Sequence, residues 1–574
     1  MNPSTALATV LVDELVRRGV REAVLCPGSR SAPFAYALQE AHRAGRLRLH
    51  VRVDERSAGF LALGLAKGSV PVPVVTTSGT AVANLHPAVL EAHHGGVPLL
   101  VVSADRPPEL RGTGANQTTD QLKLFGDAVR WFHDLGAPER RPGQNAVWRS
   151  VACRAWDAAV GLPAEGDAGP VHLNVALRDP LVPDPAGEEW PEPLDGRPEG
   201  RPWVVRAPKQ VRPFPVEACP RTLVVLGDLP LDWMYDVVAH VEDIGWPVVA
   251  EPFGWFDRST VVPHGPLVLT AQEWLDRHLP ERVLVVGRVT LSRPVQALLR
   301  REGIRVEVVD SRQRWSDPGH VAERVYPFEA LLATGGPTSG EEPWRIRRAD
   351  EEWAASWRVA GDRVYTAVQK LVDDSWPSGP AVAATVLAEL PTEATLFVGS
   401  SKAVRDLDHA MSRDVADDLH VVANRGLAGI DGCVSTAAGV ALARGRPAYA
   451  LMGDLTFLHD TNGLLIGPHE PRPDLTIVVV NDDGGGIFTT LEPGAPERAR
   501  DFERVFGTPT GASIADLCRA HGVAHQLVTS REALAQAVSV RTSGLRVVEI
   551  AAPRAAHRDL DARLREAAAR ALRD

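Results

Sequence analysis

Two short acidic motifs in the last quarter of the chain combine residue types that bind a metal ion. Gly453-Asp454-Leu455 is followed by 25 residues and then by Asn481-Asp482, with Gly484 two positions further on. Asp454, Asp482 and a backbone carbonyl near Gly484 could supply three oxygen ligands to a hard cation such as Mg²⁺, which usually leaves coordination positions open for phosphate oxygens. The spacing therefore predicts a site that binds a metal ion together with a diphosphate.

Apolar segments typical of buried strands precede both motifs. Residues 449–452 lead to Gly453, and residues 476–480 lead to Asn481. Parallel α/β sheets bind ligands at the carboxyl ends of their strands, where both motifs would lie. Gly453 would let the backbone approach a phosphate closely, and the run 484–486 of three glycines would form a turn that side chains would obstruct.

An earlier copy of the first motif provides an internal comparison. Gly227-Asp228-Leu229 also follows an apolar run, but no Asn-Asp or Asn-Asn lies about 25 residues beyond it. We therefore interpret that copy as an ordinary turn, and the paired spacing at residues 453–484 as functional.

Charge and composition exclude several classes of partner. The formal net charge of -11, from 62 basic and 73 acidic side chains, gives no electrostatic footprint for nucleic acid. The five cysteines are far apart, without a CxxC pair or a histidine at zinc spacing, as is typical of reduced core thiols. The N-terminal end lacks a signal pattern, and no apolar run approaches the roughly 18 residues that span a bilayer. We expect a cytoplasmic protein that binds neither nucleic acid nor membrane.

The 574 residues are too many for a single core, so about three domains are expected. Helical and strand patterns alternate in three stretches, which predicts an α/β fold of three doubly wound parallel-sheet domains. The expected domains are 1–185, 186–345 and 346–574. Residues 182–220 are rich in proline, glycine and charge and predict a linker, and residues 335–342 form a further break.

The expected elements follow from apolar periodicity. A first helix should end at Gly19, and further helices are expected over 57–67 and 81–92. The expected strands are 23–26, 73–77, 98–103, 223–226, 247–250, 283–286, 306–310, 395–398, 449–452, 476–480 and 545–550. Asp310 would suit a ribose-binding acid in a nicotinamide dehydrogenase, but the middle stretch lacks G-x-G-x-x-G after its first strand, which disfavours that function.

Glu55 is an acid at an expected junction between strand and helix. An extended run over residues 51–53 precedes it, and an apolar helical pattern follows. A carboxylate at such a junction can face a cleft, but acids also occupy helix starts because they interact favourably with the helix dipole. Position alone leaves both interpretations open.

The metal motif resembles the signature of thiamine-diphosphate enzymes, and Glu55 matches the characteristic glutamate of that superfamily. Further segments are similar to the 2-succinyl-5-enolpyruvyl-6-hydroxy-3-cyclohexene-1-carboxylate synthase family of menaquinone (vitamin K2) biosynthesis. The matching segments are Cys26-Pro-Gly-Ser-Arg-Ser-Ala-Pro33, Thr77-Ser-Gly-Thr-Ala-Val-Ala-Asn84, Ala104-Asp-Arg-Pro-Pro-Glu-Leu110, Gly114-Ala-Asn-Gln117, Asn424-Arg-Gly426 and Gly429-Ile-Asp-Gly432. The similarity covers both outer domains densely and the middle domain thinly.

The resemblance implies a cofactor and a role for several residues. The cofactor would be thiamine diphosphate with Mg²⁺, or with Mn²⁺. Glu55 would hydrogen-bond the aminopyrimidine ring and favour the tautomer that deprotonates the thiazolium carbon. Ile430 matches the bulky residue that holds the cofactor bent. The other matched cofactor residues are Pro27, Gly453, Asp454, Leu455, Asp482, Gly484, Ile487 and Phe488, of which Asp454, Asp482 and Gly484 would bind the metal ion.

The implied reaction is decarboxylation of 2-oxoglutarate, followed by conjugate addition of the succinyl-semialdehyde carbanion to isochorismate. Both substrates are dicarboxylic, and arginine binds carboxylates through two planar donors. The matched substrate residues are Ser29, Arg30, Arg106, Gln117, Ser401, Arg405 and Arg425. Arg293 is a weaker match, because this chain has Ser292-Arg293 where the family usually has Lys-Arg. Asp482 stands where many relatives have a second asparagine, and the added charge would attract the cation while opposing the diphosphate.

The resemblance also implies a homo-oligomer. Glu55 and the metal motif lie on different expected domains, and in this superfamily one cofactor bridges two subunits, so at least a dimer is expected and a tetramer is suggested. Two alternatives remain. Another thiamine-diphosphate 2-oxoacid decarboxylase or carboligase would not need so many arginines, and a catalytically silent metabolite-binding regulator would not need to keep Glu55, Asp454 and Asp482.

Overall fold

The computed structural model describes residues 1–161, 166–184, 189–207, 215–310, 312, 315–332, 349–411, 415, 418–541 and 543–573. The chain forms two compact units. Unit 1 comprises Met1–Gln210, Asn424–Gly445 and His459–Pro473, and unit 2 comprises Val211–Ala423, Arg446–Leu458 and Asp474–Asp574. The expected domain boundaries at 185/186 and 345/346, and the expected break at 335–342, lie outside the described residues.

Unit 1 contains a six-stranded parallel sheet with the strand order β2-β1-β3-β4-β6-β5. Its strands are β1 (Glu22–Leu25), β2 (Arg48–Val51), β3 (Val72–Thr76), β4 (Leu99–Asp105), β5 (Trp131–Leu135) and β6 (Pro170–Ala176). The strands β3, β4 and β6 are buried at every residue, as expected for the centre of a sheet that is covered on both faces.

The helices of unit 1 are α1 (Pro3–Arg17), α2 (Ala32–Arg43), α3 (Glu55–Ala66), α4 (Thr80–Ala83), α5 (His86–Gly95), α6 (Gln144–Val160) and α15 (Cys433–Arg444). The single helix expected over 81–92 is wrong, because α4 ends at Ala83 and α5 begins anew at His86. Pro87 lacks a backbone N–H and is tolerated in the first turn of α5 but not inside a continuous helix.

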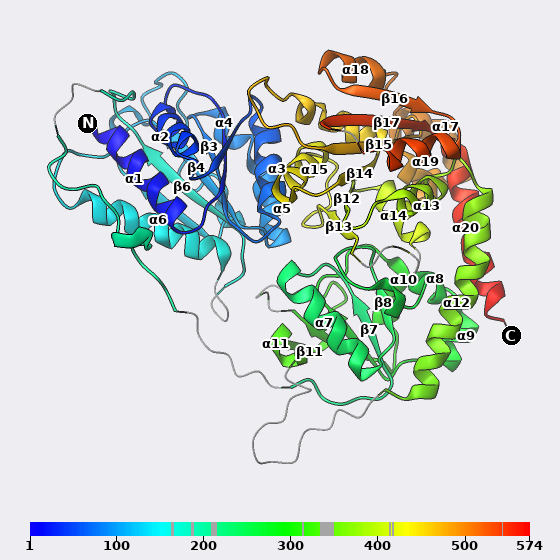
Figure 1. Ribbon diagram of the computed structural model, residues 1–574. Helices are drawn as coiled ribbons and strands as arrows, with labels where there is room; N and C mark the ends of the chain where they lie inside the picture. The colour runs from blue at the N-terminus through cyan, green and yellow to red at the C-terminus, as the bar shows by residue number, and fades with distance from the viewer. Residues whose placement is uncertain are drawn as a thin grey trace, which may run out of the picture. The chain divides into compact units, whose positions relative to one another are not determined.

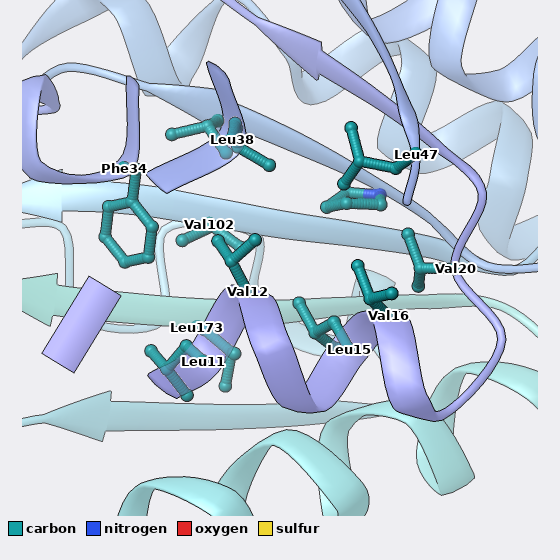
Figure 2. Close-up of a pocket in the computed structure, with 12 residues that line it drawn as sticks. Leu11, Val12, Leu15, Val16, Val20, Phe34, Leu38, Leu47, Val102 and Leu173 are labelled. Carbon is teal, nitrogen blue, oxygen red and sulfur yellow. The ribbon is translucent and has the colours of Figure 1, made fainter. Parts of the chain in front are cut away.

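The face of α1 predicted from its apolar spacing forms one side of the core of unit 1. Figure 2 shows Leu11, Val12, Leu15 and Val16 of this helix directed toward Phe34 and the other core side chains around a small void. Only apolar residues line this void, so it is part of the packed core and not a polar binding site.

Two helices of unit 1 approach each other without intervening side chains. A Cβ on Gly64 of α3 would lie 2.2 Å from the carbonyl oxygen of Thr436, and a Cβ on Gly439 of α15 would lie 2.4 Å from that of Leu61. The contact continues at Asp460, which accepts hydrogen bonds from the Ser57 hydroxyl at 3.2 Å and from a backbone N–H of α15 at 2.7 Å. Figure 1 shows α3 and α15 side by side.

Residues 189–195 of the expected linker are attached to unit 1, whereas its last described residues, 215–220, belong to unit 2. Trp190 is buried against Trp148 of α6, with ring centroids 5.8 Å apart. The Glu192 carboxylate accepts the backbone N–H groups of Gly143 and Asn145 at the start of the same helix, at 2.8 and 2.9 Å. These contacts satisfy helix donors that would otherwise lack a partner within the helix.

Unit 2 contains two more parallel sheets, so the predicted α/β fold with three parallel sheets is confirmed. The first has five strands in the order β11-β10-β9-β7-β8, and the second has six in the order β13-β12-β14-β15-β17-β16. The strands are β7 (Thr222–Leu226), β8 (Val248–Ala250), β9 (Arg282–Val286), β10 (Arg305–Val309), β11 (Ala322–Tyr326), β12 (Thr395–Val398), β13 (His420–Ala423), β14 (Ala448–Gly453), β15 (Leu475–Asn481), β16 (Ala524–Val528) and β17 (Leu545–Ala551).

The helices of unit 2 are α7 (Leu231–Ile244), α8 (Gly265–Val268), α9 (Gln272–Arg277), α10 (Arg293–Leu299), α11 (Phe328–Leu332), α12 (Glu351–Asp374), α13 (Gly379–Glu389), α14 (Lys402–Ala410), α16 (Asp454–His459), α17 (Ala499–Phe502), α18 (Ile514–Ala520), α19 (Arg531–Ser539) and α20 (His557–Ala571), of which α16 ends one residue beyond the unit. The long helices α12 and α20 lie side by side (Figure 1) and contribute Trp357 and Leu564 to a core shared with the five-stranded sheet. No helix in the described part of the chain is both long and apolar enough to cross a bilayer.

Candidate active site

The two predicted metal ligands lie at the carboxyl ends of adjacent parallel strands. Gly453 at the end of β14 pairs with Val480 near the end of β15, so the residues that follow the two strands emerge at the same edge. Asp454 begins α16 there, and Asp482 follows β15. Both side chains are buried, with 4% and 8% of their surface exposed. The structure thus brings together the two acids that the spacing predicted.

The charges of these two acids are poorly compensated within the protein. Burial raises the pKa of Asp454 to about 6, although the backbone N–H groups of Leu455 and Gly484 oppose this change. Burial, and next the charge of Asp454, raise the pKa of Asp482 to about 8. His557 lies 3.7 Å from the Asp482 carboxylate, but burial lowers the pKa of that imidazole to about 4, so it is neutral near pH 7. A bound cation would favour the ionised form of both acids.

The glycine turn after Asp482 is required by its surroundings. Gly484 has a φ of +132°, and a Cβ there would lie 1.8 Å from the carbonyl oxygen of Gly507. A Cβ on Gly486 would lie 1.7 Å from the Asp482 carboxylate. Any other residue at these positions would displace the backbone or the acid.

This donor set fits a hard divalent cation. Among the described residues no group of three or more His, Cys, Asp or Glu side chains could hold a metal ion by itself. Mg²⁺ does not need such a group, because it is commonly held by one or two carboxylates together with substrate phosphates. The two buried acids, together with one backbone carbonyl near Gly484, match this arrangement better than they match a closed site for a transition metal.

Other predicted residues surround this edge of unit 2. Ile487 and Phe488 are half-buried in a 3₁₀ turn over Gly486–Thr490, and Leu455 is half-buried in α16. Ser401 precedes α14 with a φ of +72°, a conformation that non-glycine residues rarely adopt and that often marks functional sites. Arg405 donates to the Ser401 carbonyl at 2.6 Å. Arg293 is not among them, because it begins α10 next to the five-stranded sheet, where its side chain is exposed.

The two acids that we interpreted as ordinary have protein partners. The backbone N–H of Asp228 donates to the carbonyl of Arg288 at 2.8 Å, and the Arg288 guanidinium lies 3.6 Å from the Asp228 carboxylate. Asp310 forms an ion pair with Arg312 at 2.7 Å. Each of the two carboxylates thus lies beside an arginine of the same unit.

In unit 1, Glu55 is the first residue of α3. Asp54 already caps this helix, because its carboxylate accepts the N–H groups of Arg56 and Ser57 at 2.9 and 3.3 Å. The helix start therefore does not need a second acid. The half-buried Glu55 carboxylate lies 3.5 Å from the Asn84 amide nitrogen, and Asn84 also belongs to a segment matched by the resemblance.

Several predicted substrate residues gather at the carboxyl edge of the sheet in unit 1. Arg30 is buried and donates to the Leu177 carbonyl at 2.8 Å. Burial, and next the positive charge of Arg106, lower the pKa of Arg30. Gln117 has a φ of +54°, and its amide donates to the Ser78 carbonyl at 3.1 Å. Pro27 and Ser29 are exposed in the loop between β1 and α2.

A buried polar network behind these residues was not predicted. Asn174 of β6 donates to Asp105 at 2.9 Å and accepts from Gln121, also at 2.9 Å. Asp105 in turn accepts the backbone N–H of Arg106 at 2.7 Å, and Gln121 accepts that of Gly79 at 2.9 Å. The network fixes the strand ends that carry Arg106 and the turn that leads to Gln117. The polar residues that interrupt the apolar runs of β4 and β6 were its only signal in the sequence.

Glu91 of α5 is a second residue that sequence reasoning missed. Its buried carboxylate accepts the backbone N–H groups of Gly426 and Leu427. These residues belong to the segment that also carries the buried Arg425 and the half-buried Ile430. A cavity of about 230 Å³ next to this segment is lined by Glu91, Phe60, His86, Asn424 and Asp431 among others. The only hint in the sequence was an acid between the apolar residues of a helix.

Two family models match the outer parts of the chain. Residues 5–124 match the N-terminal TPP binding domain of thiamine pyrophosphate enzymes, and residues 408–550 match the C-terminal TPP binding domain. Benzoylformate decarboxylase from Polynucleobacter necessarius has a similar fold, with a TM-score of 0.69, 17% sequence identity, and coverage of 96% of this chain and 99% of that one. The fold and the site therefore define the protein as a thiamine pyrophosphate enzyme.

Relatives that match over their full length identify the family within the thiamine pyrophosphate enzymes. The chain is 49% identical to a 2-succinyl-5-enolpyruvyl-6-hydroxy-3-cyclohexene-1-carboxylate synthase of Saccharopolyspora erythraea, with 100% of both chains covered. It is 50% identical to the synthase of Kineococcus radiotolerans, with 96% of this chain and 97% of the relative covered. The chain belongs to the 2-succinyl-5-enolpyruvyl-6-hydroxy-3-cyclohexene-1-carboxylate synthase family, as the sequence motifs predicted.

Proposed function

We propose that the protein decarboxylates 2-oxoglutarate and adds the remaining four-carbon unit to isochorismate, which gives 2-succinyl-5-enolpyruvyl-6-hydroxy-3-cyclohexene-1-carboxylate for menaquinone synthesis. The observation that carries the proposal is the buried pair Asp454 and Asp482 at the ends of β14 and β15, in a chain that matches synthases over its full length. A silent relative would have no need to keep two mutually repelling buried acids.

Asp454, Asp482 and a carbonyl of the Gly484 turn would hold Mg²⁺ or Mn²⁺ and, through it, the diphosphate of thiamine diphosphate. Gly453, Leu455, Ile487 and Phe488, which lie close to these ligands along the chain, would contact the same cofactor. The cofactor supplies an acidic carbon and an electron sink, which no amino-acid side chain provides. The protein supplies orientation and exclusion of water.

Glu55 would hold the proton that activates the cofactor. A half-buried carboxylate that α3 does not need as a cap is suited to share a proton with a ring nitrogen. Pro27 and Ile430 would contact the same cofactor.

The arginines would bind the carboxylates of the two substrates. Arg30 and Arg106 both follow strands of the sheet in unit 1, and the charge of Arg106 acts on Arg30, so the two cations together would suit a dicarboxylic ligand. Ser29, Gln117, Ser401, Arg405 and Arg425 would complete the binding site, with a smaller contribution from Arg293.

We further propose that the enzyme is a cytoplasmic homodimer or homotetramer in which residues 1–185 bind the pyrimidine, residues 186–345 form a central domain, and residues 346–574 bind the metal ion and diphosphate. The resemblance supports a cofactor that bridges two subunits.

Incubation of the purified protein with thiamine diphosphate, Mg²⁺, 2-oxoglutarate and isochorismate, followed by mass analysis, tests this function. The expected result is carbon dioxide and the addition product, each dependent on the cofactor. Reactions without isochorismate, or with pyruvate in place of 2-oxoglutarate, are the controls. Absence of the addition product, or equal use of pyruvate, would contradict the proposal.

A further inference from the structure

Arg554 contacts the backbone of the metal-binding turn from outside the site. This residue begins the short turn that leads into α20. Its Nη1 group donates to the carbonyl oxygen of Asp482 at 3.2 Å and also to that of Asp483. The Nη2 group donates to the Glu503 carboxylate at 2.5 Å. One planar guanidinium group thus joins two consecutive peptides of the turn to a second segment.

The second segment is itself hydrogen-bonded to the turn. Glu503 begins a π-helical stretch that ends at Gly507. The carbonyl of Gly507 accepts the backbone N–H of Gly485 at 2.7 Å. The Arg554 guanidinium lies close enough that a Cβ on Gly484 would approach it to 2.9 Å. The turn is therefore held on its outer face by a side chain and by a neighbouring backbone.

The direction of the peptide groups connects this outer contact to the metal ligands. In an extended or turn peptide the C=O and N–H groups point in opposite directions. The carbonyls of Asp482 and Asp483 point toward Arg554, so the N–H groups of Asp483 and Gly484 point away from it. They donate to the Asn481 side chain at 3.1 Å and to the Asp454 carboxylate. A change in the contacts of Arg554 would rotate the same peptides that face the metal site.

We propose that Arg554 is a positioning residue that holds the Asp482–Gly484 turn in its metal-binding conformation and couples it to the segment Glu503–Gly507. The proposal rests on the metal-diphosphate site of the proposed function. Residues that orient metal ligands without touching the metal commonly change metal affinity by about 10- to 100-fold when they are replaced.

The test compares Arg554→Lys and Arg554→Ala with Arg570→Ala. Lysine keeps the charge but cannot span two carbonyls and a carboxylate, so it separates geometry from electrostatics. Arg570 lies on α20, the helix that follows the turn begun by Arg554, and its side chain forms an exposed ion pair with Glu566, which makes it a matched control. Thermal unfolding verifies that each variant is folded, and if Arg554→Ala does not fold, Arg554→Lys decides the outcome.

The first measurement uses the protein without cofactor. Hydrogen exchange at the amides of Gly485 and Thr508, which bond to Gly507 and Glu503, reports on the coupling between the two segments. We expect faster exchange at both amides in the Arg554 variants and unchanged exchange in Arg570→Ala. Exchange at the wild-type rate in Arg554→Lys and Arg554→Ala would overturn the proposal.

The second measurement uses calorimetry to determine the Mg²⁺ concentration that thiamine diphosphate binding requires. We expect this concentration to rise at least about tenfold in both Arg554 variants, with kcat at saturating Mg²⁺ within a few-fold of the wild type. A loss of kcat with unchanged Mg²⁺ dependence would overturn the positioning role. If the wild type itself did not bind thiamine diphosphate with Mg²⁺, the proposed function would fail, while the exchange measurement would still decide whether Arg554 orders the turn.

Discussion

The Glu91 carboxylate lies 2.6 Å from the backbone nitrogen of Gly426 and 2.7 Å from that of Leu427. A Cβ on Gly426 would lie 2.3 Å from the Glu91 carbonyl oxygen, so this loop rests directly on α5. Glu91 therefore fixes the segment that carries Arg425 and Ile430.

Glu91→Gln should lower both stability and activity. A glutamine amide has one acceptor oxygen, so one of the two backbone N–H groups would face an NH₂ donor. A buried donor without a partner costs about 1–3 kcal/mol. We expect a lower melting temperature and a reduced kcat/KM for isochorismate. The exposed Glu40, which pairs only with Arg43, provides the control Glu40→Gln. Wild-type kcat/KM in Glu91→Gln would show that the loop does not need this carboxylate.

Glu55→Gln should remove activity while the fold and cofactor binding persist. The amide cannot exchange a proton with a ring nitrogen, and loss of general acid–base catalysis typically costs about 10²- to 10⁴-fold in rate. Turnover is measured with both substrates, and thiamine diphosphate binding is measured separately by calorimetry. Because Asp54 caps α3, the helix should be unaffected, and circular dichroism checks this. Unchanged turnover would refute the proposed proton relay.

Asp482→Asn should stabilise the metal-free protein increasingly as the pH rises. The folded pKa of Asp482, about 8, lies above the ordinary aspartate value of 3.8, so the folded state holds this proton more tightly than the unfolded state. The acid therefore reduces stability progressively between about pH 4 and pH 8, where it loses its proton. Melting temperatures of variant and wild type, measured in chelator from pH 5 to pH 8, should diverge with pH. A constant difference would contradict the assigned burial.

Gly439→Ala should destabilise unit 1. The added methyl group would lie 2.4 Å from the Leu61 carbonyl, so α3 and α15 would have to separate. Overpacking of this kind typically costs about 1–3 kcal/mol. Gly68→Ala is the matched control, because a Cβ at that position meets no atom within 4 Å. The midpoint of denaturant unfolding is measured for both variants. Equal midpoints would show that α3 and α15 accommodate the added methyl group without loss of stability.

The sequence predicted the interior of each sheet better than its margins. The apolar runs that became β14 and β15 are buried at nearly every residue, so their pattern was unambiguous. The strands that were missed include β5, β11, β13 and β16, which each lie at the edge of a sheet, and also β6, which is buried between β4 and β5. An edge strand has one neighbour and exposes more of its side chains, as β11 and β16 do, so the apolar pattern weakens.

The site residues that could be predicted are those that lie next to a recognisable strand in the sequence. Asp454 and Asp482 each follow directly from a strand end, and their spacing carried the prediction. Glu91 and Arg554 escaped it because their partners lie 335 and 72 residues away, respectively. A single acid or arginine has no recognisable sequence pattern when its partner is distant in the chain, so its contact cannot be predicted before the fold is known. The network around Asn174 escaped for the same reason.

Unit 1 is assembled from segments that lie far apart in the chain, so they leave the ribosome at different times. Ser57 of α3 and its partner Asp460 are 403 residues apart. At a ribosomal speed of about 5–20 residues per second, the glycine face of α3 would wait on the order of 20 to 80 seconds for its partner helix. During that interval the nascent chain exposes a surface that chaperones recognise, so we expect yield in a heterologous host to depend on chaperone supply more than on the stability of the finished enzyme.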